Sequence, residues 1–136
     1  AAVAGTPMDF SSTPHLIGER IDTDTDQLRW ARGYDHTYIL DKELGKLAIA
    51  SRCSSPKTGI VMEVYTDQPG VQLYTGNWMS GNLRGKHDHR YPARAALCLE
   101  TQHYPDSPNK PEYPSTRLNP GETFRSTTIF RFTLEA

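Results

Sequence analysis

Apolar and polar residues alternate with a period of two in several short segments of the chain. In residues 59–66, for example, Ile60, Met62 and Val64 alternate with Val61, Glu63 and Tyr65. Because successive side chains of a strand point to opposite faces, this alternation predicts β-strands. Strands are predicted at 33–40, 46–51, 59–66, 71–75, 95–102 and 123–134. No segment has a helical period, so the sequence predicts an all-β protein with an antiparallel β-sandwich.

The segments between these strands have the composition of turns and loops. Pro69-Gly70 and Pro120-Gly121 suit type II turns, in which glycine takes the position with positive φ. Residues 53–58 are predicted to form a turn, and 77–92 and 103–114 to form surface loops, the latter because of its four prolines. The acidic run 22–26 begins like a calcium loop, but Gln27 and Gly33 occupy the positions where an EF-hand needs Gly and Glu. A solvated acidic loop is therefore expected there.

The strand predicted at 95–102 places a carboxylate beside small side chains. Leu97 and Leu99 lie on one face with Ala95 and Thr101, and this face is predicted to be core. The opposite face carries Ala96, Cys98 and Gln102 together with Glu100. A carboxylate held above small residues is a candidate general base, and the alternative is a solvated glutamate at a strand end. The last strand, 123–134, is predicted to be half-buried, with Thr128, Phe130, Phe132 and Leu134 on one face.

Composition narrows the range of functions. With 15 Lys and Arg against 16 Asp and Glu, the net charge of −1 predicts no binding to nucleic acid or to anionic membranes. No segment is apolar enough to span a membrane, and no signal peptide is evident. Cys53 and Cys98 form neither a metal pair nor a disulfide framework, so buried thiols and a cytoplasmic location are expected. His87 and His89 have a spacing that metals use, but no fourth ligand is evident and no metal site is predicted.

Several motifs along the chain together resemble those of the aldose 1-epimerase (galactose mutarotase) family. They occur in the family's order and extend over nearly the whole chain: GTPMDF at 5–10, GYDH at 33–36, QPGVQLYTGN at 68–77, CLETQ at 98–102, PDS at 105–107 and NPGE at 119–122. The resemblance implies the galactose mutarotase-like supersandwich. Residues 1–136 would be the C-terminal portion of that single domain.

The family interconverts the α and β anomers of hexoses such as galactose and glucose, and it uses no metal or other cofactor. Opening the sugar ring at C1 requires a base for the O1 proton and an acid for the ring oxygen O5. By resemblance, Glu100 matches the family's catalytic base, and Asp35 and Gln72 match substrate-binding residues. Thr37 stands where the family commonly has Asn.

The family's catalytic acid is a histidine of the N-terminal half, and the chain's own histidines match none of the family's site positions. These are His15, His36, His87, His89 and His103. The resemblance therefore implies a complementary N-terminal chain or segment as a partner.

Three alternatives remain open at this point. The chain could be a non-catalytic carbohydrate-binding module that uses Asp35, Gln72 and Glu100. It could be a fragment that is ordered by self-association and has no activity. It could also belong to a hexose-phosphate epimerase, which needs cationic side chains for the phosphate and could use Arg84, Lys86 and Arg90.

Overall fold

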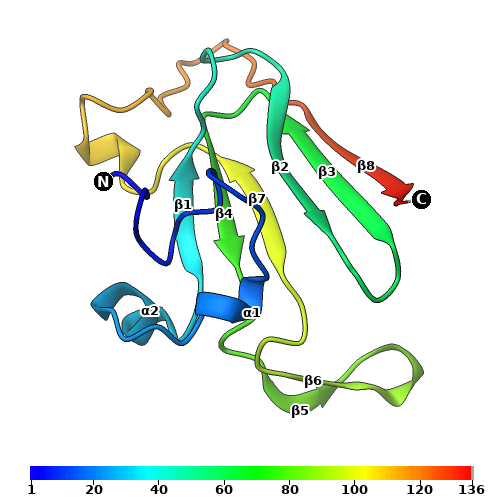
Figure 1. The fold of residues 1–136 in the computed structure, drawn as a ribbon. Helices are drawn as coiled ribbons and strands as arrows, with labels where there is room; N and C mark the ends of the chain where they lie inside the picture. The colour runs from blue at the N-terminus through cyan, green and yellow to red at the C-terminus, as the bar shows by residue number, and fades with distance from the viewer. Residues whose placement is uncertain (136) are drawn as a thin grey trace. The chain divides into compact units, whose positions relative to one another are not determined.

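The computed structural model describes residues 1–135, and the chain divides into two compact units. The first unit comprises residues 1–36 and 74–98, and the second comprises residues 37–73 and the chain from 99 on. Figure 1 shows the strands and helices, coloured by position in the sequence. The strands are β1 (Asp35–Ile39), β2 (Ala48–Ser54), β3 (Ile60–Thr66), β4 (Gly70–Tyr74), β5 (Ser80–Arg84), β6 (Arg90–Pro92), β7 (Cys98–Gln102) and β8 (Thr128–Leu134). The helices are α1 (Ile17–Arg20), α2 (Asp26–Ala31) and the short 3₁₀ turns η1 (Lys86–Asp88) and η2 (Ser107–Asn109).

The strands form three small sheets, with strand orders β1-β4-β7, β2-β3-β8 and β5-β6. The pairs β2–β3, β3–β8 and β5–β6 are antiparallel. The predicted all-β antiparallel class is therefore confirmed. None of the helices formed by residues 1–135 is long and apolar enough to cross a bilayer.

Two short helices were not predicted. Helix α2 buries only Leu28 and ends at Ala31. Arg32 caps it with a left-handed backbone, and the cap N–H donates to the carbonyls of Arg29 and Leu28. Helices this short show too few turns for a hydrophobic period, because one turn takes 3.6 residues. The acidic run 22–26 is a loop for most of its length, and Asp26 is the first residue of α2.

Several predicted boundaries differ from the structure. Strand β2 continues to Ser54, beyond the predicted turn start at Cys53, and β7 begins only at Cys98. The segment predicted as a polar loop contains the hairpin β5–β6, which the prediction missed because its residues are largely exposed and do not alternate. The thiol of Cys98 is exposed, contrary to the expectation of burial.

The two Pro-Gly pairs behave differently. Gly121 has φ +87°, and the N–H of Glu122 donates to the carbonyl of Asn119, so a turn with positive φ forms there as predicted. Gly70 instead begins β4 and is not among the glycines with positive φ, so the predicted type II turn at Pro69-Gly70 is wrong. A Cβ on Gly70 would lie 3.1 Å from both the Thr37 methyl carbon and the Tyr104 ring. Close packing, rather than a turn, accounts for this glycine.

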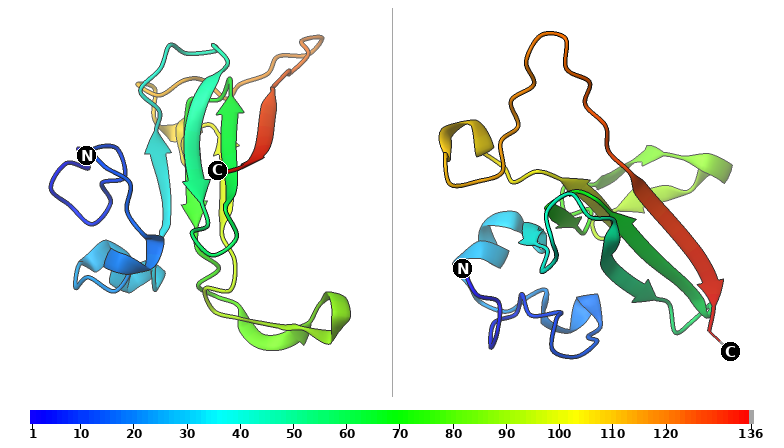
Figure 2. Two further views of the ribbon diagram at one scale, coloured as in Figure 1. Left: turned by 45° about the vertical axis from the view of Figure 1, so that its right-hand side comes forward. Right: turned by 90° about the horizontal axis from the view of Figure 1, so that it is seen from above.

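The β2-β3-β8 sheet of the second unit has one charged face and one apolar face. On the charged face, Glu63 lies opposite Arg52 and Arg131, with N–O distances of 4.0 and 3.5 Å. On the apolar face, Phe132 lies opposite Met62 and Leu134 lies opposite Ile60. Figure 2 shows β8, in red, running beside the green β3.

Part of the apolar face of this sheet is open to solvent, although Val64 on the same face is fully buried. The exposed fractions are 64% for Phe132 and 74% for Leu134, and Phe130 and Ile60 are also exposed. The alternation predicted along β8 is correct, but the prediction of a half-buried strand is wrong. Six of the seven residues of β8 are exposed.

The core of the first unit is built around Tyr34, whose side chain is fully buried. The Tyr34 ring meets the ring of Phe10 edge to face at 5.2 Å, and its hydroxyl donates to the carbonyl of Pro7 at 2.9 Å. Ile21 and Leu28 are the other buried apolar residues contributed by the segment before β1. An aromatic ring with a satisfied hydroxyl ties the irregular N-terminal segment to the start of β1.

The buried carboxylate of Asp9 organises the turn that follows it. Its Oδ1 accepts hydrogen bonds from the N–H and the hydroxyl of Ser11, at 2.9 and 2.8 Å, and from the N–H of Ser12 at 3.2 Å. These bonds, those from Ser11 above all, lower the pKa of Asp9 from 3.8 to about 2. The pKa of Asp9 is lower in the folded chain than in the unfolded chain. The ionised carboxylate therefore stabilises the fold above pH 3.8, and this stabilisation is lost as the pH falls through about 2.

We therefore expect an NMR titration of the Asp9 carboxyl carbon to show a midpoint near pH 2 in the folded chain. The same residue in urea should titrate near its ordinary value of 3.8. Ser11→Ala should move the folded midpoint upward, because it removes the hydroxyl donor while the backbone donor remains. A folded midpoint equal to the one in urea would contradict this interpretation of the turn.

Candidate functional site

Gln72 lies in the middle of β4, with its amide held by a residue of the neighbouring strand β1. The hydroxyl of Thr37 donates a hydrogen bond to Oε1 of Gln72, and both residues belong to the second unit. Val71 and Leu73, which flank Gln72 and point to the opposite face, are buried. The side chain of Gln72 is half-buried. This partial burial leaves the amide fixed in direction but accessible from one side.

Glu100 lies on β7, the other neighbour of β4, and its side chain is exposed. The predicted alternation is present: Leu99 and Thr101 are half-buried, whereas Cys98 and Glu100 are exposed. Thr101 also shares a hydrogen bond of 2.6 Å with Thr128, which fixes the side of β7 opposite to Glu100.

Contacts just beyond the ends of β4 and β7 show the relative direction of these strands. Past the C-terminal end of β4, the Cα of Gly76 lies close to Ala96, since a Cβ there would be 3.0 Å from the Ala96 carbonyl oxygen. Before its N-terminal end, Gln68 hydrogen-bonds His103 at 2.8 Å. The two strands therefore run in opposite directions. Gln72 and Glu100 lie on these two neighbouring strands of one sheet.

Asp35, the third predicted residue, belongs to the first unit and begins β1. It directly follows the buried Tyr34 and is itself half-buried. Its N–H donates to Nδ1 of His36 at 3.0 Å. Burial lowers the pKa of the His36 imidazole below its ordinary value, and the neighbouring Asp35 carboxylate opposes this shift. The lowered pKa favours the neutral imidazole, whose Nδ1 accepts the hydrogen bond from the Asp35 N–H.

The sequence analysis did not predict a polar network that lies just beyond the end of β7. The Nδ1 of His103 lies 2.8 Å from Oε1 of Gln68, and Nε2 of Gln68 donates to the hydroxyl of Ser126 at 2.9 Å. Oδ2 of Asp67 accepts from the N–H of Thr127 at 2.8 Å. Burial raises the pKa of Asp67, but hydrogen bonds from Gln68, Thr127 and Ser126 outweigh it and the pKa is lowered. The network joins the start of β4, the end of β7 and the start of β8 within the second unit.

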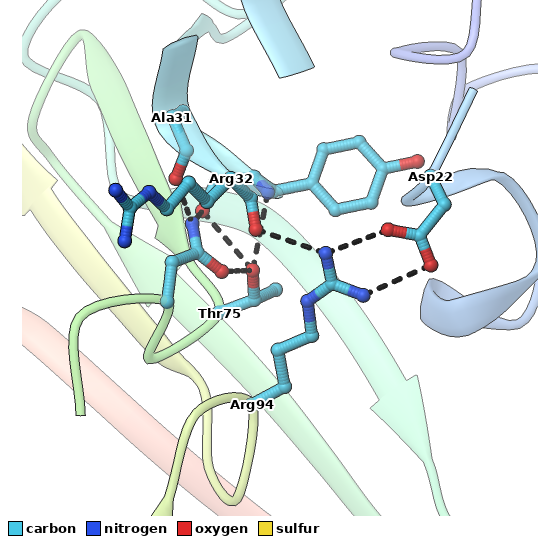
Figure 3. Close-up of polar contacts among 7 residues, drawn as sticks. Asp22, Ala31, Arg32, Thr75 and Arg94 are labelled. Carbon is cyan, nitrogen blue, oxygen red and sulfur yellow. Dashed lines mark hydrogen bonds and ion pairs between the residues drawn. The ribbon is translucent and has the colours of Figure 1, made fainter. Parts of the chain in front are cut away.

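A second polar network, in the first unit, surrounds the turn before β1 (Figure 3). The Asn77 side-chain amide donates to the carbonyls of Ala31 and Tyr34, both at 2.9 Å. The hydroxyl of Thr75 donates to Oδ1 of Asn77 at 2.6 Å and accepts from the N–H of Tyr34 at 3.1 Å. Thr75 and Asn77 are buried, so these side chains take the place of backbone partners for the turn.

Arg94 anchors the segment before β7 to the same region of the first unit (Figure 3). Its guanidinium forms two hydrogen bonds to the Asp22 carboxylate, at 2.7 and 3.0 Å, and a third to the carbonyl of Arg32 at 3.0 Å. The hydrogen bonds from Arg94 lower the pKa of Asp22. Arg94 and Arg32 both have left-handed backbones, with φ of 64° and 59°. The paired side chain holds Arg94 in a backbone conformation that non-glycine residues seldom adopt.

Beside this ion pair is a cavity of about 480 Å³ in the first unit. It is lined by Ile17, Gly18, Ile21, Asp22, Thr75, Arg94, Ala95, Ala96 and Leu97. None of the three predicted site residues lines it. Its two charged lining residues, Asp22 and Arg94, are paired with each other.

The β5–β6 hairpin carries the histidines and cations that the sequence offers as metal or phosphate ligands. Asp88 is paired with Arg84, and the rings of His87 and His89 lie 6.5 Å apart. Among residues 1–135 no group of three or more His, Cys, Asp or Glu side chains is arranged to hold a metal ion. The pairing of Arg84 also reduces the positive charge available to a sugar phosphate.

The fold and these residues define an antiparallel β-protein with a carboxylate and an amide on neighbouring strands of one sheet. The model of the aldose 1-epimerase family matches residues 1–131, and the chain belongs to this family. It is 46% identical to galactose mutarotase from Mus musculus, 44% to galactose mutarotase from Homo sapiens and 36% to aldose 1-epimerase from Escherichia coli K12. In each case 98% of the chain is aligned, and the chain spans 37–38% of the relative's length.

A solved structure gives the same result for the fold. The GalM/aldose epimerase homologue from C. elegans superimposes with a TM-score of 0.79 at 25% identity. This alignment covers 98% of the chain and 38% of the homologue. The predicted galactose mutarotase-like fold class is thus confirmed.

Proposed function

We propose that this chain supplies the catalytic base and the sugar-binding groups Asp35 and Gln72 of an aldose 1-epimerase acting on hexoses such as galactose and glucose. The observation that carries the proposal is that Gln72 and Glu100 lie on the neighbouring strands β4 and β7 of one sheet. An accessible carboxylate and an oriented amide suit a polyol, because hydrogen bonds to charged groups contribute about 1.5–3 kcal/mol each. The names of the relatives support the same activity.

The reaction needs two proton transfers around C1 of the sugar. Glu100 takes the proton from the O1 hydroxyl as the C1–O5 bond breaks and an aldehyde forms at C1, while an acid protonates O5. Rotation about the bond between C1 and C2 exposes the other face of the aldehyde. Ring closure returns the O5 proton to the conjugate base of the acid and the Glu100 proton to O1. Asp35 and Gln72 hold the ring hydroxyls, which keeps the open chain in place for closure.

The acid comes from a complementary N-terminal segment or chain in this proposal. The histidines of this chain do not match the family's acid, and the chain spans 37% of the mouse relative's length. The exposed apolar face formed by Phe130, Phe132, Leu134 and Ile60 gives such a segment a surface to cover. Contiguous apolar surface of this kind is typical of a face that packs against other protein.

Complementation tests the proposal. The chain is mixed with the part of mouse galactose mutarotase that lies outside the matched segment, and the optical rotation of fresh α-galactose is followed. We expect the mixture to accelerate mutarotation well above the buffer rate and above either part alone. A mixture whose parts bind each other and galactose but leave the rate at the buffer value would contradict an epimerase and favour a carbohydrate-binding module.

A further inference from the structure

Tyr74, the last residue of β4, lies on the same face of the sheet as Gln72. Val71 and Leu73 are buried on the opposite face, whereas Gln72 and Tyr74 are both half-buried. Successive side chains of a strand point to opposite faces, so this burial pattern places Gln72 and Tyr74 together. Tyr74 therefore belongs to the face that carries the proposed sugar contacts of β4.

A backbone contact between β1 and β4 brings Tyr74 next to Asp35, and both residues belong to the first unit. Figure 1 shows these neighbouring strands running in opposite directions. The N–H of Thr75 donates to the carbonyl of Tyr34 at 3.0 Å. In antiparallel strands, the residue before Thr75 then lies opposite the residue after Tyr34. Tyr74 is thus the neighbour of Asp35 across the two strands.

The hydroxyl of Tyr74 is fixed as an acceptor on one side. Its oxygen accepts a hydrogen bond from the backbone N–H of Trp78 at 3.2 Å. A backbone N–H can only donate, so the direction of this bond does not depend on how the hydroxyl is turned. Among residues 1–135 the structure gives this hydroxyl no second hydrogen bond. The contact with Trp78 holds the oxygen in place and leaves the O–H proton for an acceptor outside the chain.

We propose that Tyr74 is a further sugar-binding residue, whose hydroxyl donates a hydrogen bond to one oxygen of a hexose bound beside Asp35. A tyrosine suits this role because its ring packs against the C–H groups of a sugar while its hydroxyl makes the polar contact. The acceptor is a hydroxyl oxygen or the ring oxygen of the hexose, since both have lone pairs. This inference rests on the proposed function, because it adds a contact to the same site.

A cycle of substitutions in the protein and in the sugar tests this contact. Tyr74→Phe removes the hydroxyl and keeps the ring. Calorimetry gives the dissociation constants of galactose, of each monodeoxy galactose and of the analogue with CH₂ in place of the ring oxygen. The chain is used together with the complementary part of mouse galactose mutarotase.

We expect Tyr74→Phe to weaken the binding of galactose about two- to tenfold, the range for one neutral hydrogen bond. For the one analogue that lacks the oxygen bound by Tyr74, the same substitution should leave the dissociation constant unchanged. The difference between these two effects measures the direct contact between the hydroxyl and that oxygen.

An indirect effect on the fold gives a different pattern. Tyr74→Phe also releases the N–H of Trp78, and a loss that acts through this loop would weaken the binding of every sugar by the same factor. Equal factors for galactose and all analogues, or an unchanged affinity for galactose, would overturn the inference. Tyr65→Phe is the matched control, because the Tyr65 hydroxyl donates to Glu63 in another sheet. It should leave every dissociation constant unchanged.

The wild-type titration separates this inference from the proposed function. If the wild-type chain and its complementary part do not bind galactose, the proposed function fails and the role of Tyr74 fails with it. If the wild type binds galactose and the cycle shows no coupling, the sugar site stands and only the role of Tyr74 is wrong.

Discussion

Glu100→Gln is expected to lower the rate of mutarotation by at least about a hundredfold, because general base catalysis contributes roughly 10²–10⁴-fold and an amide cannot take the O1 proton. The side chain keeps its size, and Glu100 is exposed on β7, so the fold should not change. The galactose dissociation constant should stay within a few-fold of wild type, since the amide can still accept a hydrogen bond from O1. Polarimetry with the complementary segment present gives the rate, and calorimetry gives the affinity.

Glu112→Gln provides the matched control for this substitution. Glu112 is also exposed, but it lies in the proline-rich loop after β7, outside the proposed site. The control should leave the rate unchanged. An equal rate for Glu100→Gln and wild type would contradict the assignment of the base, and an equal loss of rate and affinity would make Glu100 a binding group instead.

Gly33→Ala should destabilise the chain by roughly 2–4 kcal/mol, because it strains the backbone and also disturbs a buried hydrogen-bond network. Gly33 has φ +141°, a conformation that L side chains rarely adopt. A Cβ there would lie 2.5 Å from Oδ1 of Asn77 and 3.1 Å from Oγ1 of Thr75. Both atoms are held by the bonds that fix the turn before β1, so neither can move away without losing partners.

Urea unfolding monitored by circular dichroism measures this effect, with Gly18→Ala as the matched control. Gly18 lies in α1 with no atom within 4 Å of its Cβ position, and its φ is outside the glycine-favouring region. Alanine stabilises a helix interior relative to glycine by about 1 kcal/mol, so Gly18→Ala should be neutral or slightly stabilising. If Gly33→Ala unfolded at the same urea concentration as wild type, the turn network would not be what positions β1 and Asp35.

The sequence predicted the strands in which apolar and polar residues alternate, and it missed the strands in which they do not. Strand β3, whose residues alternate in the sequence, is the central strand of its sheet and buries Val61 on one face and Val64 on the other. The hairpin β5–β6 is almost entirely exposed, so no apolar period reveals it. The turn wrongly predicted at Gly70 has a similar cause. Pro-Gly signals a turn locally, but here the glycine is required by Thr37 and Tyr104, which are 33 or more positions away in the sequence.

The sequence likewise predicts only part of the candidate site, namely the residue types and not the contacts between them. The residue types Asp35, Gln72 and Glu100 follow from motifs that lie within single segments of the sequence. The contacts that orient them join distant segments: Thr37 with Gln72, and Gln68 with His103, are each 35 residues apart. Local propensity carries no information on such pairs, because they are set by strand order and register.

Exchange NMR on galactose labelled with ¹³C at C1 tests the central claim most directly, because it detects interconversion of the anomers at equilibrium. In the presence of the chain and its complementary segment, cross-peaks between the α and β C1 signals should grow faster than in buffer. They should return to the buffer rate with Glu100→Gln. Exchange at the buffer rate while the C1 signals broaden from binding would contradict an epimerase and leave a protein that only holds the sugar.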